Sequence, residues 1–183
     1  FTTSVKTNGM IAVLPQNRAE ISPYFGGYIK NIKLLPGDKV EKGQVLFTME
    51  NPAFVEVQRD FLEAMGQLRY LKSDYKRQQE LLADNVSSEK KFLKAEAAYK
   101  VTLAQYQSLK KKLWLMNINP DKLTDENITS VIQVRSPLSG YATKIMGHKG
   151  SYLNPEDIAL TVTNTDHLHI ELKIFEQDLP LLK

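Results

Sequence analysis

Two stretches of the chain, residues 54–82 and 92–116, carry the pattern that most limits what the chain can fold into. In each stretch a mostly apolar residue recurs at alternating spacings of three and four. That spacing keeps the side chains in one narrow stripe along a helix, which is typical of a helix packed against a single partner helix. The first stripe consists of Phe54, Val57, Phe61, Ala64, Leu68, Leu71, Tyr75, Gln78 and Leu82. The second consists of Phe92, Ala95, Tyr99, Thr102, Tyr106, Leu109, Leu113 and Met116.

The segment between the stripes, "ADNVSS", has the chemistry of a turn. Asp, Asn and Ser side chains bond to nearby backbone N–H groups in turns and at helix starts. Two stripes of nearly equal length joined by a short turn predict an antiparallel coiled-coil hairpin over residues 52–117. At 1.5 Å per residue each arm is about 40–45 Å long. We expect such a hairpin to project well beyond a small domain.

The segments on either side of the hairpin read as strands and resemble each other. "SPYFGGYIKNIKLLPGDKVEKGQVLFTM" aligns with "SPLSGYATKIMGHKGSYLNPEDIALTV", so that Gly37 falls on Gly150 and Phe47 on Leu160. Each half has about 30 residues, which is too few to bury a core alone. The two halves therefore predict one flattened barrel or sandwich interrupted by the hairpin, an α+β fold.

Composition and missing motifs exclude several classes of function. The chain has no cysteine, which excludes disulfides, thiolate metal sites and cysteine nucleophiles. Its net charge of +3 is too weak to indicate nucleic-acid binding. No apolar run approaches the length of about 18 residues that a membrane span needs. No catalytic triad, paired carboxylates or phosphate-binding glycine loop is visible, so we expect no enzyme and no cofactor.

The half-motifs carry a resemblance to known families. "LLPGDKVEKGQVLFTMEN" resembles the first half of biotinyl/lipoyl carrier domains. "VRSPLSGYATKIMGHKGSYLNPEDIALTVTNTDHLHIELKIFEQDLP" is similar to the second half in periplasmic adaptors, or membrane fusion proteins (HlyD-like), of tripartite efflux systems. A carrier has a lysine about three residues after the acidic residue, where this chain has Asn51, Pro52 and Ala53. In the adaptor family a helical hairpin replaces that turn.

Two further segments, "WLMNINPDKLTDENITSVIQVRSP" and "TDHLHIELKIFEQDLP", resemble the heavy-metal-type adaptors that serve pumps of the RND type. The resemblance implies a periplasmic protein anchored to the inner membrane through a segment outside this chain. It implies an inner-membrane RND-type transporter and an outer-membrane channel as partners, and a ring of copies in the full assembly. An adaptor for an ABC-type or type I secretion exporter and a carrier domain remain as alternatives.

The resemblance also implies a division of the chain. Residues 1–20 and 166–183 would be strands of an incomplete adjacent β-barrel, 21–51 and 131–165 a lipoyl-like β-domain, 52–117 the hairpin and 118–130 a connector.

The candidate site is the tip of the hairpin. Adaptors of this family often carry an Arg, Leu, Ser pattern there that docks onto the channel, and Arg77, Leu81 and Ser87 match it in kind and order. Ser87 arrives one residue early against the usual spacing. The alternative is that Ser87 or Ser88 caps the second helix and that Arg77 is a solvated side chain.

The other residues that could indicate a binding site have structural interpretations. His167 and His169 lie on one face of a predicted strand, but two imidazoles are an incomplete metal site, and we interpret them as surface residues. Met116 is a stripe residue and is expected in the core. Trp114 is expected to pack the joint between hairpin and β-domain. The lysines of the second helix fall outside the stripe and indicate a solvated face, with no nucleic-acid partner.

Overall fold

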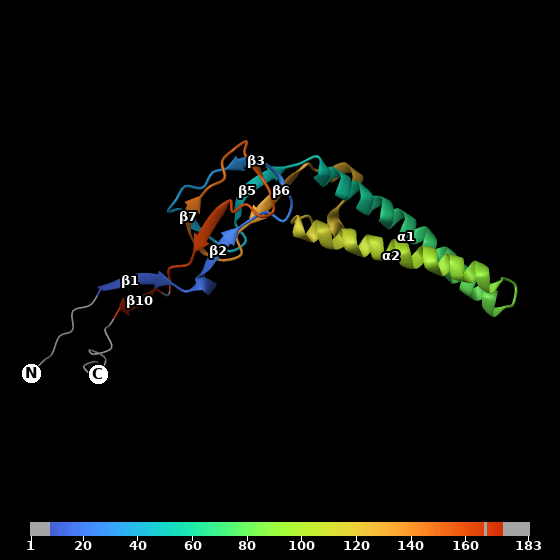
Figure 1. Cartoon of the computed structure of the whole chain (residues 1–183). Coiled ribbons are helices and arrows are strands. Elements are labelled where there is room, and N and C mark those ends of the chain that lie inside the picture. The colour runs from blue at the N-terminus through green and yellow to red at the C-terminus, as the bar shows by residue number, and fades with distance from the viewer. Residues whose placement is uncertain (1–7, 167, 174–183) are drawn as a thin grey trace, which may run out of the picture.

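The β-domain is a sandwich of two four-stranded antiparallel sheets. The structure, a computed structural model, describes residues 8–166 and 168–173. The first sheet contains, in spatial order, β2 (Arg18–Ile21), β9 (Leu160–Thr163), β7 (Gly140–Ile145) and β4 (Lys39–Val40). The second contains β6 (Val131–Arg135), β5 (Val45–Glu50), β3 (Gly27–Ile32) and β8 (Tyr152–Leu153). The domain lies between the long hairpin on one side and a two-stranded ribbon on the other (Figure 1).

The two sheets have the same construction, which confirms the predicted internal repeat. In the repeat, the strands β2, β3, β4 and β5 correspond to β6, β7, β8 and β9. With this correspondence, the order β2-β9-β7-β4 of the first sheet becomes the order β6-β5-β3-β8 of the second. The turn glycines match as well: Gly37 has φ +97° and Gly150 has φ +88°. The N–H of Gly37 donates to the carbonyl of Ala142 at 2.7 Å, and that of Gly150 donates to Ile29 at 2.8 Å. Both turns therefore need a residue that tolerates positive φ.

Each half of the repeat contributes two strands to each sheet. β4 comes before the hairpin in the sequence but pairs with β7, and β8 comes after the hairpin but pairs with β3. Each sheet thus contains strands from both sides of the insertion. The buried side chains of Val40, Phe47 and Leu160 belong to one continuous core. The two flanking segments form one body, as the sequence predicts.

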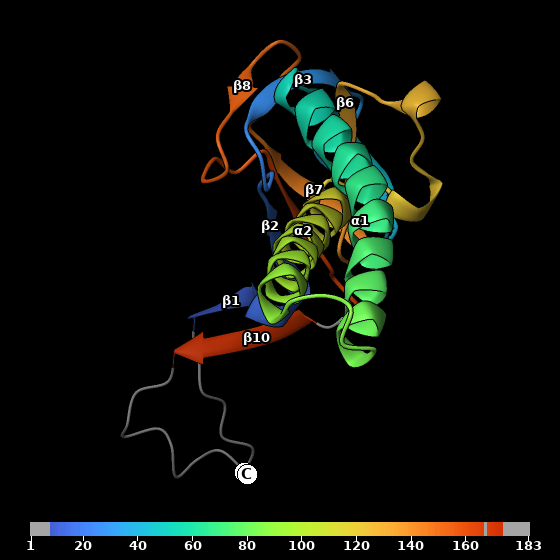
Figure 2. The same cartoon turned by 90° about the vertical axis from the view of Figure 1, so that its right-hand side faces the viewer.

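The hairpin consists of α1 (Ala53–Ala83) and α2 (Glu89–Leu115), packed side by side (Figure 2). All the predicted stripe residues are buried or partly buried. Aromatic rings form layers between the helices: Phe61 stacks on Tyr106 with ring centres 5.1 Å apart, and Tyr75 stacks on Tyr99 at 5.4 Å. The two long helices confirm the predicted α+β class.

The joint between hairpin and sandwich is apolar, but Trp114 does not pack it. Leu113 and Met116 are buried there, next to Leu123 and Ile132, whereas Trp114 is 51% exposed. Positions 113 and 116 face α1, and one residue on from Leu113 the helix has turned by about 100° toward solvent. The prediction for Met116 is confirmed and the prediction for Trp114 is wrong.

A connector links α2 to β6 and carries two short 3-10 helices, η2 (Pro120–Lys122) and η3 (Asp125–Asn127). Asn119 caps η2 by accepting a hydrogen bond from the N–H of Asp121 at 2.9 Å. Lys110 of α2 forms an ion pair with Asp121 at 2.8 Å, which attaches the connector to the hairpin. Figure 2 shows the connector beside the base of the hairpin.

The ends of the described chain pair with each other. β1 (Asn8–Val13) and β10 (Leu168–Lys173) form an antiparallel ribbon, and no closed barrel is present in residues 8–166 and 168–173. The predicted boundary at residue 20 falls inside β2, which follows η1 (Pro15–Asn17) and pairs with β9 of the sandwich. Residues 18–20 belong to the sandwich because they form β2 together with Ile21, whose side chain is buried in the sandwich core.

Candidate partner-contact site at the hairpin tip

The turn at the tip is closed by backbone hydrogen bonds. α1 ends at Ala83, and the carbonyl of Leu81 accepts hydrogen bonds from the N–H groups of Val86 at 2.8 Å and Ser87 at 3.0 Å. Asn85 has φ +57°, the left-handed conformation that commonly follows a helix end. The apex therefore has one defined backbone path, although its sequence contains neither glycine nor proline.

Ser87 joins the two arms through its side chain. Its hydroxyl donates to the Oε1 atom of Gln78 at 2.9 Å, and both residues are partly buried. Ser88 occupies the cap position of α2 but makes no side-chain capping bond. The hydrogen bond from Ser87 explains why the first stripe has a polar member at Gln78. The amide of Gln78 faces the turn and bonds to the chain where it enters the second arm.

Arg77 and Leu81 lie one turn apart on α1. The guanidinium of Arg77 is 62% exposed and forms an ion pair with Asp74. Leu81 is partly buried beside the turn. Val86, at the apex, is 73% exposed and was not identified from the sequence, where a single valine in a polar turn has no distinguishing pattern. The tip thus presents an exposed cation and an exposed apolar side chain.

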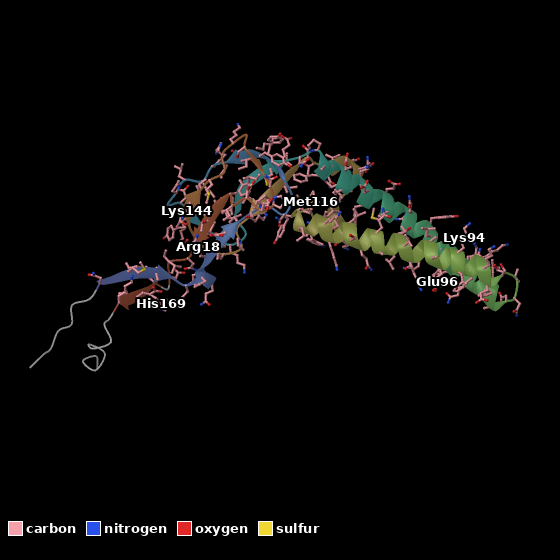
Figure 3. All side chains as sticks on the ribbon, viewed as in Figure 1. Arg18, Lys94, Glu96, Met116, Lys144 and His169 are labelled. Atoms are coloured by element: carbon pink, nitrogen blue, oxygen red, sulfur yellow. The ribbon has the colours of Figure 1, made fainter. Side chains whose placement is uncertain are left out.

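The outer half of the hairpin is positively charged. Residues 68–100 contain eight basic and five acidic side chains. Lys100 is paired with Glu96 at 2.7 Å, and this hydrogen bond raises the pKa of Lys100. Lys94 and Glu96 point in different directions from α2 (Figure 3). Among the residues that the structure describes, no ion pair involves Lys90, Lys91 or Lys94, so these charges are available to an acidic partner.

At the opposite end of the hairpin, Asn51 occupies the region where a carrier domain has its lysine. Its Nδ2 donates to the carbonyl of Gly26 at 2.7 Å, and its Oδ1 accepts from the N–H of Ala53 at 2.9 Å. The next residue back, Glu50, accepts hydrogen bonds from Lys30 and Ser130, which lower the pKa of its carboxyl. The residues at this turn therefore hold the start of α1.

The histidines do not form a metal site in the described part of the chain. His169 lies on β10 opposite Ala12, and His148 lies between β7 and β8 with Nδ1 3.3 Å from the carbonyl of Met146. His167 is outside the described residues. In residues 8–166 and 168–173 no three His, Cys, Asp or Glu side chains gather as ligands. Over the same residues, no helix is both long and apolar enough to cross a membrane.

Comparison with known sequences finds a curated relative. An uncharacterised protein of Haemophilus influenzae is 25% identical over all 183 residues. The chain spans 42% of the length of that relative. No protein-family model matches the chain.

Comparison with solved structures identifies the fold. ZneB from Cupriavidus metallidurans is 23% identical, with a TM-score of 0.57 over 96% of this chain and 72% of its own. A MacA–MexA chimera with the α-hairpin domain of Pseudomonas aeruginosa MexA is 19% identical, with a TM-score of 0.65 over 96% and 60%. The membrane fusion protein Spr0693 from Streptococcus pneumoniae is 19% identical, with a TM-score of 0.58 over 96% and 70%.

These structures define the class of protein to which the fold corresponds. The chain has the fold of the membrane fusion protein Spr0693, of ZneB and of the MacA–MexA chimera. The resemblance predicted from the split half-motifs and the hairpin between them is confirmed.

Proposed function

We propose that the chain is part of a periplasmic adaptor that joins an inner-membrane RND-type efflux pump to an outer-membrane channel. The observation that carries this proposal is the hairpin itself. Its first helix has 31 residues, a length of about 46 Å, and projects from the sandwich at the place where a carrier would hold its prosthetic group. The proposed function is to bridge the pump and the channel and to transmit changes from one to the other, and the chain performs no chemistry of its own.

The proposed partners follow from the two ends of the molecule. The tip, with Arg77, Leu81 and Ser87, contacts the periplasmic end of the channel. Ser87 contributes mainly by fixing the turn, because its hydroxyl already bonds to Gln78. Copies of the adaptor stand side by side as a ring, and the pump lies toward the inner membrane, where a segment outside this chain anchors the protein.

The exported substrates that we propose are metal ions or small toxic compounds. This rests on the resemblance of the connector and of the segment after residue 164 to heavy-metal-type adaptors. An adaptor for an ABC-type or type I secretion exporter is the alternative, because the same helical hairpin can serve either kind of pump. A carrier domain is not supported, because the turn from β5 into α1 has no lysine to modify.

The test is co-purification of the complex from the native cell with Arg77→Asp in the protein as it is expressed there. We expect recovery of the outer-membrane channel to fall about tenfold, equivalent to about 1.4 kcal/mol, while the pump is retained and helical content is unchanged. The matched control is Arg69→Asp, which makes the same charge reversal on an exposed residue of α1 farther from the tip.

Unchanged recovery of the channel with Arg77→Asp would contradict the tip contact. Mass spectrometry of the complex purified with the unaltered protein then identifies the pump. An RND-type transporter supports the proposal, and an ABC-type transporter in its place would establish the alternative.

A further inference from the structure

Gln58 is a polar side chain buried in the joint between the hairpin and the sandwich. It lies in the second turn of α1 and has 0% of its surface exposed. Its Nε2 donates to the carbonyl of Phe54 at 2.6 Å and to the carbonyl of Thr129 at 2.7 Å. Its Oε1 accepts a hydrogen bond from the N–H of Thr129 at 3.1 Å. The amide therefore pairs with both backbone groups of one residue, as a neighbouring strand would.

Thr129 is itself attached to the sandwich. It lies just before β6, which pairs with β5. The next residue, Ser130, accepts a backbone hydrogen bond from the N–H of Asn51 at 3.0 Å, and its hydroxyl donates to Glu50 at 3.0 Å. A bond from α1 to Thr129 is therefore a bond from the hairpin to the sheet.

We propose that Gln58 is a positioning residue that sets the direction of the hairpin relative to the sandwich. Asn51 fixes where α1 begins, and Asn117, just after α2, donates from its Nδ2 to the carbonyl of Gln133 on β6 at 3.0 Å. Gln58, seven residues after Asn51, adds a further attachment to the same sheet and is the one that holds α1 beyond its first turn. The apolar contacts of the joint resist separation without favouring one direction, whereas hydrogen bonds have narrow preferences in distance and angle.

The length of the hairpin makes small tilts at the joint large at the tip. For a helix of 31 residues, a tilt of about 10° at the base displaces the tip by about 8 Å. A displacement of that size would separate the tip from any partner surface of fixed position. The hydrogen bonds between Gln58 and Thr129, at the base of the hairpin, therefore help to fix the position of the tip, whichever partner the tip binds.

Pulsed electron paramagnetic resonance between two spin labels tests this directly. The chain has no cysteine, so Lys94→Cys on α2 and Lys144→Cys on β7 provide two exposed labelling sites, one on each side of the joint (Figure 3). With Gln58 present we expect one narrow distance distribution. With Gln58→Met, which keeps the side-chain length but removes the amide, we expect the distribution to broaden about twofold or its centre to move.

The control is Gln67→Met in the same labelled chain. Gln67 lies on α1 and is exposed, and its amide donates to Glu63 of the same helix at 3.2 Å. We expect this variant to leave the distance distribution unchanged. The same narrow distribution with Gln58→Met as with Gln58 would overturn the proposal, and so would equal broadening with Gln67→Met.

Hydrogen exchange of the unaltered protein gives a second test that does not depend on any variant folding. The N–H of Thr129 bonds to a buried side chain, so we expect it to exchange as slowly as the paired amides of β6. Exchange of the Thr129 amide as fast as that of the exposed connector residue Glu126 would contradict the attachment.

Discussion

The paired glycines of the two half-motifs show how single residues shape the sandwich. Gly27 begins β3 and Gly140 begins β7, each followed by tyrosine. A Cβ atom on Gly140 would lie 2.3 Å from the carbonyl oxygen of Thr163, and one on Gly27 would lie 3.0 Å from that of Glu50. Gly140 is required by the close approach of a neighbouring strand end, and Gly27 makes a tight contact at the same place in the other sheet.

We predict that Gly140→Ala destabilises the protein by about 1–3 kcal/mol, because the new methyl group meets rigid backbone. Gly66→Ala is the matched substitution. A Cβ atom on Gly66, which lies on α1, would have no neighbouring atom within 4 Å, so alanine there should stabilise by about 0.5–1 kcal/mol. Urea unfolding followed by circular dichroism measures both changes, and equal effects at the two sites would disprove the packing argument.

At the scale of elements, the hairpin is held together by layers of aromatic rings along its seam. Tyr75 contacts two rings of α2, Tyr99 with centres 5.4 Å apart and Phe92 at 5.7 Å. Aromatic pairs of this kind stabilise by about 0.5–1.5 kcal/mol beyond the area they bury. The layer lies in the outer part of the hairpin, where the sandwich offers no support, so the two helices there depend on each other.

We predict that Tyr75→Ala destabilises the hairpin by about 2 kcal/mol and lowers its thermal unfolding temperature. Tyr70→Ala removes the same side chain from a position that is 67% exposed on the same helix, and its effect should stay within about 0.5 kcal/mol. Thermal melts in which helix content is followed by circular dichroism compare the two. A loss for Tyr70→Ala as large as for Tyr75→Ala would mean that the seam does not stabilise the hairpin.

At the scale of the whole molecule, the hairpin and the terminal ribbon leave the sandwich at equivalent points of its internal repeat. Asn51 follows β5 and Asn164 follows β9, and each accepts a hydrogen bond from the N–H two residues on. Their own N–H groups donate to Ser130 and Asn17, respectively. The chain thus uses the same local structure twice, once to start the hairpin and once to lead toward β10 (Figure 1).

We predict that the sandwich folds without the hairpin. The N–H of Asn51 bonds to the carbonyl of Ser130 at 3.0 Å, so a linker of about four Gly and Ser residues can replace residues 53–129. The shortened chain should keep a cooperative thermal transition at a lower temperature, because the contacts of Phe54 and Met116 with the core are lost. Dispersed amide signals in a nuclear magnetic resonance spectrum would confirm the fold, and a spectrum of an unfolded chain would refute it.

The sequence by itself determined the hairpin, its length and the duplicated half-motifs. These follow from local rules: a spacing of three and four selects a helix with one buried stripe, and a turn at Gly37 or Gly150 needs positive φ wherever it occurs. The tip residues Arg77 and Leu81 could be placed near the turn for the same reason.

Only the tertiary structure decided which groups meet across the chain. The pairing of β4 with β7 and of β8 with β3, the bond from Ser87 to Gln78 and the pairing of Gln58 with Thr129, 71 residues apart, have no local signal. A polar side chain finds its partner according to the positions of whole elements, and nearby sequence does not encode those positions. The exposure of Trp114 likewise depends on where the sandwich lies around α2, because the stripe fixes only the face that α2 turns toward α1.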